Sequence, residues 1–175
     1  MSSIVREEVA ADCAAVRQVH RDAFGGDEEA RLVDALRDEG YVNVSLVAET
    51  AGRIVGHVLF SRLPIETARG TVEALSLAPL AVHPACQRSG IGSRLVREGL
   101  RICRERGHRI VVVLGHPEYY PRFGFSPALA ERLKSPYSGA AFMALELVPG
   151  ALDGVEGEVR YPPPFQGFEG EEGPG

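Results

Sequence analysis

One short segment, residues 80 to 92, restricts the fold of this chain more than any other. It reads Leu-Ala-Val-His-Pro-Ala-Cys-Gln-Arg-Ser-Gly-Ile-Gly. The apolar run that ends at Val82 predicts a buried strand, and Pro84 stops it because proline has no backbone N–H to donate. A helical pattern begins at Gly90. The segment therefore predicts a strand, a tight turn and a helix in direct succession.

The helix expected after this turn, residues 90 to 106, has the clearest amphipathic pattern in the chain. Apolar side chains fall on one side, and arginines recur on the other at helical spacing. The apolar set is Ile91, Leu95, Ile102 and Cys103, and the basic set is Arg94, Arg97, Arg101 and Arg104. We interpret the arginine face as exposed to solvent.

The start of this helix has the chemistry of an anion site. The first turn of a helix leaves backbone N–H groups without partners, and the helix dipole makes that end positive. Gly90 and Gly92 have no side chains, so an anion can approach these N–H groups closely. Gln87 and Arg88 add side-chain donors beside the turn. The pattern favours binding of a pyrophosphate.

Other phosphate-binding motifs do not match this turn. A Walker A loop needs Gly-Lys-Ser/Thr, but Gly92 is followed by Ser93 and Arg94. A dinucleotide fingerprint needs a third glycine where this chain has Leu95. An isolated Gly-x-Gly also occurs where glycines only shape a tight loop. An unrelated nucleotide-binding protein that shares this turn stays as a weaker alternative, which preferential binding of ATP or NAD would support.

The rest of the chain alternates helical and strand patterns without an internal repeat. We expect helices at residues 12–24, 27–40, 117–123 and 127–134, and strands at 42–49, 53–62, 73–82, 110–114, 140–148 and, as an edge strand, 158–161. The run from Ile110 to Leu114 is continuously apolar and rich in β-branched residues, as in strands buried on both faces. This order predicts an α/β (α+β) fold with a mixed sheet and helices on both faces.

Length and charge limit the function classes. The chain has 175 residues, a formal net charge of -5 and a pI near 5.6. We expect one domain over residues 1–168 and a disordered tail over 169–175, where Gly, Pro and Glu dominate. The acidic balance argues against nucleic acid and against an anionic membrane surface as partners. No apolar run reaches the length of a membrane span.

The cysteines and histidines indicate neither disulfides nor a metal site. Cys13, Cys86 and Cys103 lie far apart and form no Cys-x-x-Cys pair, which is typical of a reducing compartment. The start of the chain has acidic residues where a signal peptide needs an apolar stretch, so we expect a cytoplasmic protein. The five histidines show no ligand spacing with one another or with cysteine, and we expect no metal.

The segment at residues 80–92 resembles the acetyl-CoA signature of the GCN5-related N-acetyltransferase (GNAT) family. The family motif Gln/Arg-x-x-Gly-x-Gly/Ala is matched by Gln87, Gly90 and Gly92, after a strand that contains Leu-x-Val. The resemblance implies a mostly antiparallel central sheet flanked by helices. Two adjacent strands of that sheet, here 73–82 and 110–114, would splay apart around an acyl-CoA.

The same resemblance implies a set of cofactor-binding residues. Backbone groups of Leu80, Ala81 and Val82 would pair with the pantetheine arm as an added strand does. Gln87 opens the motif, and the backbone N–H groups that follow would hold the pyrophosphate. These belong to Arg88, Ser89, Gly90, Ile91, Gly92 and Ser93. Acetyl-CoA is therefore the expected co-substrate.

A second segment, residues 114 to 125, supports the same family. It resembles the family's Tyr-x-x-x-Gly-Phe motif at Tyr120, Gly124 and Phe125, and its fuller wording is similar to a bacterial subgroup of N-acetyltransferases. The resemblance places Tyr120 where it protonates the departing CoA thiolate. A phenol, with an ordinary pKa of about 10, carries its proton at neutral pH. Tyr119 is the rival, because a shift of one residue exchanges the two.

The general base is open. Some family members have a glutamate at the position of Ser76, and a serine cannot act as the base. Glu66, Glu73 and His116 are candidates, with His116 best placed because it follows the buried strand. A chain of water molecules is the alternative.

The resemblance implies transfer of an acetyl group from acetyl-CoA to an amine, on a small molecule or a protein, by direct attack. The missing glutamate leaves a non-catalytic acyl-CoA-binding regulatory module as the alternative. Acceptor pockets in this fold are built largely from loops, here residues 20–30, 62–72 and 134–140. The acidic balance favours a cationic acceptor such as a polyamine, an aminoglycoside or a protein amino terminus. The acyl-chain preference is open, and so is assembly into a homodimer.

Overall fold

A six-stranded sheet forms the centre of the fold, and one pair of its strands runs parallel. The computed structural model describes residues 2–137, 139–166 and 168. The strand order is β1-β2-β3-β6-β7-β9, and each neighbouring pair except β6 and β7 is antiparallel. The strands span Ser3–Glu7 (β1), Val42–Thr50 (β2), Arg53–Arg62 (β3), Leu75–Val82 (β6), Ile110–Leu114 (β7) and Phe142–Glu146 (β9). The mixed, mostly antiparallel sheet predicted above is confirmed.

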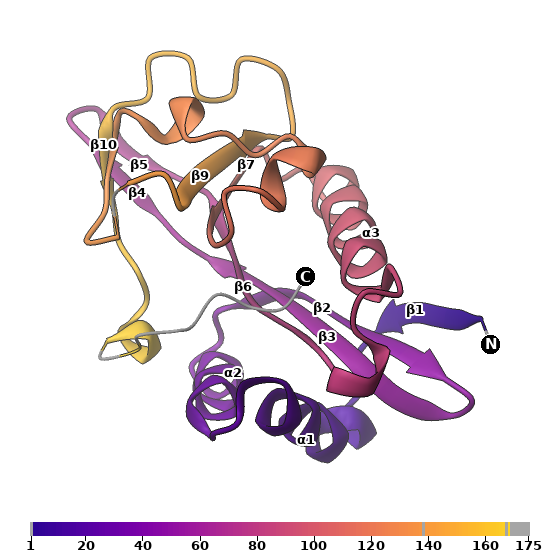
Figure 1. The fold of residues 1–175 in the computed structure, drawn as a ribbon. Coiled ribbons are helices and arrows are strands. Elements are labelled where there is room, and N and C mark those ends of the chain that lie inside the picture. Colours follow the sequence, from indigo (N-terminus) through magenta and orange to yellow (C-terminus); the bar gives the residue numbers. More distant parts are fainter. Residues whose placement is uncertain (1, 138, 167, 169–175) are drawn as a thin grey trace.

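Helices cover both faces of this sheet. Helices α1 (Cys13–Phe24) and α2 (Glu28–Asp38) lie on one face and α3 (Ile91–Glu105) on the other (Figure 1). Alternate residues of the central strands point to opposite faces. Leu46 and Phe60 pack in the core cluster that contains α3, whereas Val47 and Leu59 pack in the cluster that contains α1 and α2. The continuously apolar strands are therefore buried on both sides.

A second, smaller sheet packs against the end of the central sheet that contains β7 and β9. Its order is β5-β4-β10-β8, with bounds Ile65–Thr67 (β4), Gly70–Val72 (β5), Leu133–Lys134 (β8) and Gly157–Val159 (β10). It shares a third apolar cluster with Ile110 and Val112, which point away from α3 on β7. This sheet lies beside β7 and β9 in Figure 1.

Several expected elements differ from those observed. Strand β1 was not expected, because a short edge strand with Ile4 exposed lacks the alternation of a half-buried strand. The helix expected at 127–134 is wrong: a 3₁₀ turn at Ala128–Ala130 is followed by β8, whose partner β10 is distant in sequence. Strand β10 lies between β4 and β8 and is not an edge strand.

Two further segments of the chain differ from the predicted elements. Only Tyr120–Phe123 forms a 3₁₀ helix where a helix over 117–123 was expected. The 62–72 segment, expected to be a loop, forms the β4–β5 hairpin, whose strands are too short to leave a periodic pattern. The tail at 169–175 lies outside the described residues.

A buried polar chain joins α1 to the central sheet. Nε2 of His20 lies 2.8 Å from Nδ1 of His57, whose Nε2 lies 2.8 Å from Oγ of Ser45. The Ser45 hydroxyl donates to Oε1 of Glu8 at 2.7 Å, and Glu8 also forms an ion pair with Arg37. The Ser45 hydroxyl donates its proton to Glu8, so its oxygen can only accept a hydrogen bond from His57. Nε2 of His57 therefore carries a proton, and Nδ1 of His57 accepts a hydrogen bond from Nε2 of His20. The hydrogen bonds therefore leave His57 neutral, with its proton on Nε2.

Burial holds these histidines neutral in acid as well. It is the largest cause that lowers the pKa of His20 to about 3, with the charge of Arg37 second. Burial likewise lowers the pKa of His57 well below its usual value, with His20 and Arg37 adding to it. The unfolded chain binds protons below about pH 6.5 and the folded chain does not, so stability falls as the pH drops below that value.

We predict a loss of stability in mild acid, measured as the midpoint of thermal unfolding at pH 7.5 and 5.5. Each of the two histidines should contribute about 1.4 kcal/mol per pH unit below about 6.5. The midpoint should therefore fall by roughly 5–10 °C. His20→Gln should reduce the difference between the two pH values more than the control His83→Gln, which changes a half-buried histidine outside this polar chain. An undiminished difference in His20→Gln would contradict this origin.

Candidate functional site

Strand β6 is paired on both sides at its start and on one side at its end. Leu75–Leu77 pair in parallel with Val111–Val113 of β7, and the pairing stops there. Leu80–Val82 remain paired with β3. Among the described residues no strand bonds the opposite edge of Leu80–Val82. The two strands expected to splay, at 73–82 and 110–114, thus diverge in the structure (Figure 1).

An irregularity in β6 explains the divergence. Phe60 of β3 faces Leu77 and Val58 faces Leu80, so one extra residue is inserted in β6 between these pairs. Such a bulge bends and twists the strand that carries it. Pro79 lies within the bulge and has no N–H to offer a neighbouring strand. The backbone of Leu80–Val82 is consequently directed away from β7.

The turn after β6 is held by its own side chains and backbone. His83 N–H donates to the Val55 carbonyl at 2.8 Å, which anchors the end of the strand. Nε2 of Gln87 donates to the Val82 carbonyl at 3.0 Å. The sequence suggested Gln87 as a donor beside the anion site, but in this structure its amide closes the turn. Ser89 Oγ donates to the Cys86 carbonyl in the same way.

Helix α3 begins with backbone donors that have no helical partner. Gly90 is its N-cap residue at φ 87°, a left-handed conformation that favours glycine. The first helical bond runs from Arg94 N–H to the Gly90 carbonyl at 3.0 Å. The N–H groups of Ile91, Gly92 and Ser93 precede that bond and therefore lack a partner within the helix. The turn at residues 83–90 connects them to the open edge of β6.

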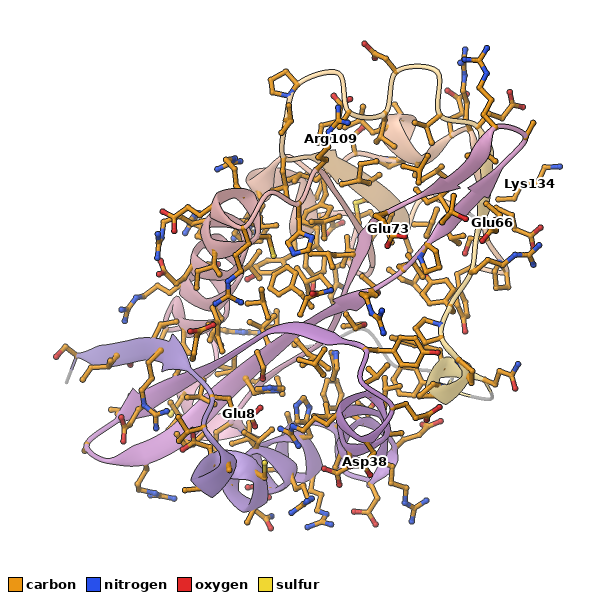
Figure 2. All side chains as sticks on the ribbon, turned by 180° about the vertical axis from the view of Figure 1, so that it is seen from behind. Glu8, Asp38, Glu66, Glu73, Arg109 and Lys134 are labelled. Carbon is orange, nitrogen blue, oxygen red and sulfur yellow. The ribbon has the colours of Figure 1, made fainter. Side chains whose placement is uncertain are left out.

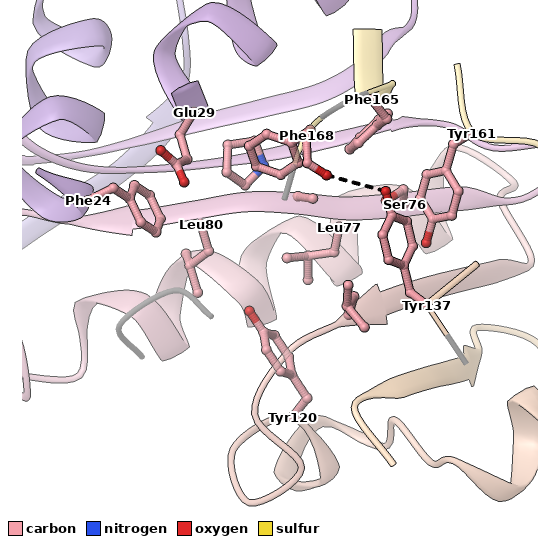
Figure 3. A pocket seen from close by; sticks show the side chains of 13 residues that line it. Phe24, Glu29, Ser76, Leu77, Leu80, Tyr120, Tyr137, Tyr161, Phe165 and Phe168 are labelled. Carbon is pink, nitrogen blue, oxygen red and sulfur yellow. Dashed lines mark hydrogen bonds between the residues drawn. The ribbon is translucent and has the colours of Figure 1, made fainter. Parts of the chain in front are cut away.

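The two candidate tyrosines have different surroundings. Tyr120 is only 4% exposed, packs in the core beside Phe125, and its hydroxyl points toward Leu80 and Leu77 (Figure 3). A Cβ on Gly115 would lie 2.3 Å from the Tyr120 ring, so the glycine makes room for this orientation. The structure thus brings Tyr120, and not its neighbour, to the splayed strands.

Tyr119 points to α3. Its hydroxyl lies 3.0 Å from Oγ of Ser93, and the Arg122 guanidinium stacks over its ring at 4.5 Å. Burial is the largest cause that raises the pKa of Tyr119. Tyr119 therefore helps position the first turn of the helix.

A cavity of about 360 Å³ opens beside the splayed strands. Its lining residues come from α1, α2, β6, β7, the Tyr120 turn and two distant segments near 137 and 161–168. They are Phe24, Glu29, Ser76, Leu77, Ala78, Pro79, Leu80, Leu114, Tyr120, Tyr137, Tyr161, Phe165 and Phe168 (Figure 3). Of the loops expected to build an acceptor pocket, 20–30 and 134–140 contribute and 62–72 does not.

The three residues considered as a base do not line this cavity. Glu66 and Glu73 are exposed and lie at the β4–β5 side of the molecule (Figure 2), where Glu66 accepts hydrogen bonds from Thr71. His116 is half-buried, and its carbonyl accepts the Tyr119 and Tyr120 N–H groups at 3.1 and 3.3 Å. The His116 backbone therefore helps to hold the turn that carries the two tyrosines, and its side chain does not line the cavity.

Sequence reasoning missed Glu29, a buried carboxylate at the cavity. It lies in the first turn of α2, where an acidic residue is expected simply to complement the helix dipole. It also missed Tyr161, Phe165 and Phe168, since they stand in a Pro- and Gly-rich stretch. The concentration of aromatic side chains there was the available signal, because disordered segments contain few of them.

Within residues 2–137, 139–166 and 168, no group of three or more His, Cys, Asp or Glu side chains could hold a metal ion. Over the same residues, every helix is too short or too polar to cross a bilayer. Cys103 is buried, which raises the pKa of its thiol to about 12.

Comparisons with known proteins agree with the fold and the turn. A family model described as an acetyltransferase (GNAT) domain matches residues 5–128. The chain is 36% identical over 168 residues to the uncharacterized N-acetyltransferase YhbS of Escherichia coli strain K12, an alignment that covers 94% of this chain and 99% of that protein. It is 40% identical over 123 residues to the N-acetyltransferase YjhQ of the same strain, covering 69% and 68% of the two chains.

Solved structures give the same result. The crystal structure of Escherichia coli YhbS in complex with CoA has a TM-score of 0.89 and 35% identity, with 98% of this chain and 95% of that chain covered. A GNAT acetyltransferase from Brucella melitensis in complex with acetyl-CoA has a TM-score of 0.78 and 36% identity, covering 94% and 98%. The chain belongs to the GNAT family of acetyltransferases.

Proposed function

We propose that this protein transfers an acetyl group from acetyl-CoA to a primary amine by direct attack. The observation that carries the proposal is that one segment of the chain has both the open edge of Leu80–Val82 and, after a turn, the N–H groups at the start of α3 that have no partner within the helix. An extended arm can pair with the former and a pyrophosphate with the latter. Two relatives were crystallised with CoA or acetyl-CoA, which supports acetyl-CoA as the donor.

The chemistry follows from the position of Tyr120 at the cavity. The amine nitrogen attacks the thioester carbonyl carbon, the C–N bond forms and the C–S bond breaks. The ammonium loses one proton to solvent before the attack. Tyr120 gives its proton to the departing thiolate, and the second proton, which the nitrogen loses after the attack, restores Tyr120. Most of the rate enhancement comes from holding amine and thioester together in one cavity. No step requires a covalent intermediate on the enzyme.

A non-catalytic acyl-CoA-binding module is the second candidate. It is favoured by one observation: Ser76 lines the cavity at the position where some family members have a glutamate. Tight binding of CoA without thiol release over a wide panel of amines would support it against the first proposal.

We further propose that the protein works in the cytoplasm as a single domain over residues 1–168. Cys13, Cys86 and Cys103 are all free thiols, as expected in a reducing compartment. The segment that ends at Phe168 contributes to the same cavity as α2 and β6.

We predict that Gly90→Glu abolishes acetyl-CoA binding while the protein remains folded. The substitution puts a negative charge at the anion site and a side chain at φ 87°. Gly107→Glu is the matched control, because Gly107 has the same φ of 87° and the same open surroundings at the other end of α3. Calorimetry with acetyl-CoA, dephospho-CoA, ATP and NAD provides the measurement. Equal loss in both variants would contradict the assignment, and failure of the folded wild type to bind acetyl-CoA would overturn the proposed function.

We predict that Tyr120→Phe lowers kcat by about 100-fold or more without weakening acetyl-CoA binding, because the acid is lost and the ring is kept. Tyr119→Phe should have a small effect, since its hydroxyl contacts Ser93 and not the cavity. Thiol release with a panel of primary amines, followed from pH 6 to 9, gives the comparison. A Tyr120→Phe variant with wild-type turnover across that range excludes the acid role.

A further inference from the structure

Aromatic side chains form one side of the cavity. The ring centroids of Tyr137 and Tyr161 lie 5.3 Å apart, those of Tyr161 and Phe165 5.2 Å, and those of Phe165 and Phe168 6.2 Å. Phe24 adds a ring from the end of α1. Tyr137 Oη donates to the Phe168 carbonyl at 3.4 Å, which joins the loop before β9 to the C-terminal segment. These five residues are called the aromatic wall.

Glu29 places a carboxyl group at the cavity. Of the described residues that line it, Glu29 alone carries a carboxylate, and none carries a lysine, arginine or histidine side chain. Glu29 is 4% exposed. Figure 3 shows its carboxylate directed into the cavity next to Phe24 and Phe168. In apolar surroundings a carboxylate gains strongly from a cation that forms charge-assisted hydrogen bonds with it.

We infer that the acceptor is a primary amine with a single positive charge on an apolar, preferably aromatic, body, and that Glu29 binds its ammonium group. This inference rests on the proposed acetyl transfer and names the substrate class for it. The rings of the aromatic wall provide apolar contact for the body and π-faces that attract the cation. A cavity of about 360 Å³ is the size of a small-molecule site.

The residues that line the cavity disfavour polycations as acceptors, although the net charge of the chain suggested them. A polyamine or an aminoglycoside carries further ammonium groups, and each must lose its water on entering the cavity. With one carboxylate among the described lining residues, a second ammonium has no buried partner to offset that cost. The acidic residues elsewhere on the surface do not change this, because exposed charges are screened by solvent and salt.

Calorimetry on the CoA-loaded protein tests the role of Glu29 without requiring turnover. The probe is 2-phenylethylamine, and the variants are Glu29→Gln and, as matched control, Glu28→Gln, which changes the exposed neighbour on the same helix. Glu29→Gln should weaken binding by about 10- to 100-fold, the range for loss of a charged hydrogen bond. Glu28→Gln should bind as the wild type does. Unchanged binding in folded Glu29→Gln, or equal weakening in both variants, overturns the inference.

Acetyl transfer tests the substrate class separately. The value of kcat/KM should be highest for 2-phenylethylamine, lower for hexylamine and lowest for spermidine. Phe168→Leu should reduce the value for 2-phenylethylamine more than that for hexylamine, which keeps the inference testable if Glu29→Gln does not fold. A preference for spermidine overturns the inference and leaves the proposed acetyl transfer standing. Absence of transfer to every amine overturns the proposed function, whereas the calorimetric comparison still decides the role of Glu29.

Discussion

The site depends on the bulge in β6 that ends its pairing with β7. Up to Leu77 the strand is bonded on both sides, and from Leu80 onward it is bonded to β3 alone. A strand with an unpaired edge tends to pair with a strand of another chain, which can lead to aggregation. Here the turn at residues 83–90 connects that edge to the N-terminus of α3, and Leu80 lines a cavity. The divergence of two strands therefore creates both the proposed cofactor groove and the space for the acceptor.

Close packing keeps α3 in the position that this arrangement requires. A Cβ on Gly56 of β3 would lie 2.9 Å from the Leu95 side chain, and a Cβ on Gly99 would lie 2.3 Å from the Phe60 ring. The two glycines thus allow the helix to approach the sheet closely, and the interface is tightly interdigitated. Because α3 rests on the sheet in this way, its first turn has a fixed relation to the end of β6. On the opposite face, the His20–His57 pair joins α1 to the same strand, β3.

The proposed acceptor side is assembled differently from the proposed cofactor side. The cofactor side comes from one continuous segment, β6 to α3, whereas the aromatic wall and Glu29 come from α1, α2 and the region after residue 136. Membership in the GNAT family accounts for the proposed cofactor side. It says little of the proposed acceptor side, since loops and chain ends differ freely between relatives. The net charge of the whole chain is also a poor guide to the acceptor. Its net charge of -5 favours any cation, but the described residues that line the cavity provide one carboxylate among aromatic rings.

The sequence by itself determined the features that are local in the chain. The strand, turn and helix around residues 80–105 were predicted because apolar runs, Pro84 and the glycines act over a few residues. Which of Tyr119 and Tyr120 faces the cavity could not be predicted from the sequence, since adjacent residues share a motif and only packing against Gly115 and α3 separates them. Strands β4 and β8 are stabilised by pairing with β10, a partner distant in sequence, so they leave no periodic signal. For the same reason only the tertiary structure brought Glu29 to the aromatic wall: their proximity results from how helices and the chain end pack, and no local pattern encodes it.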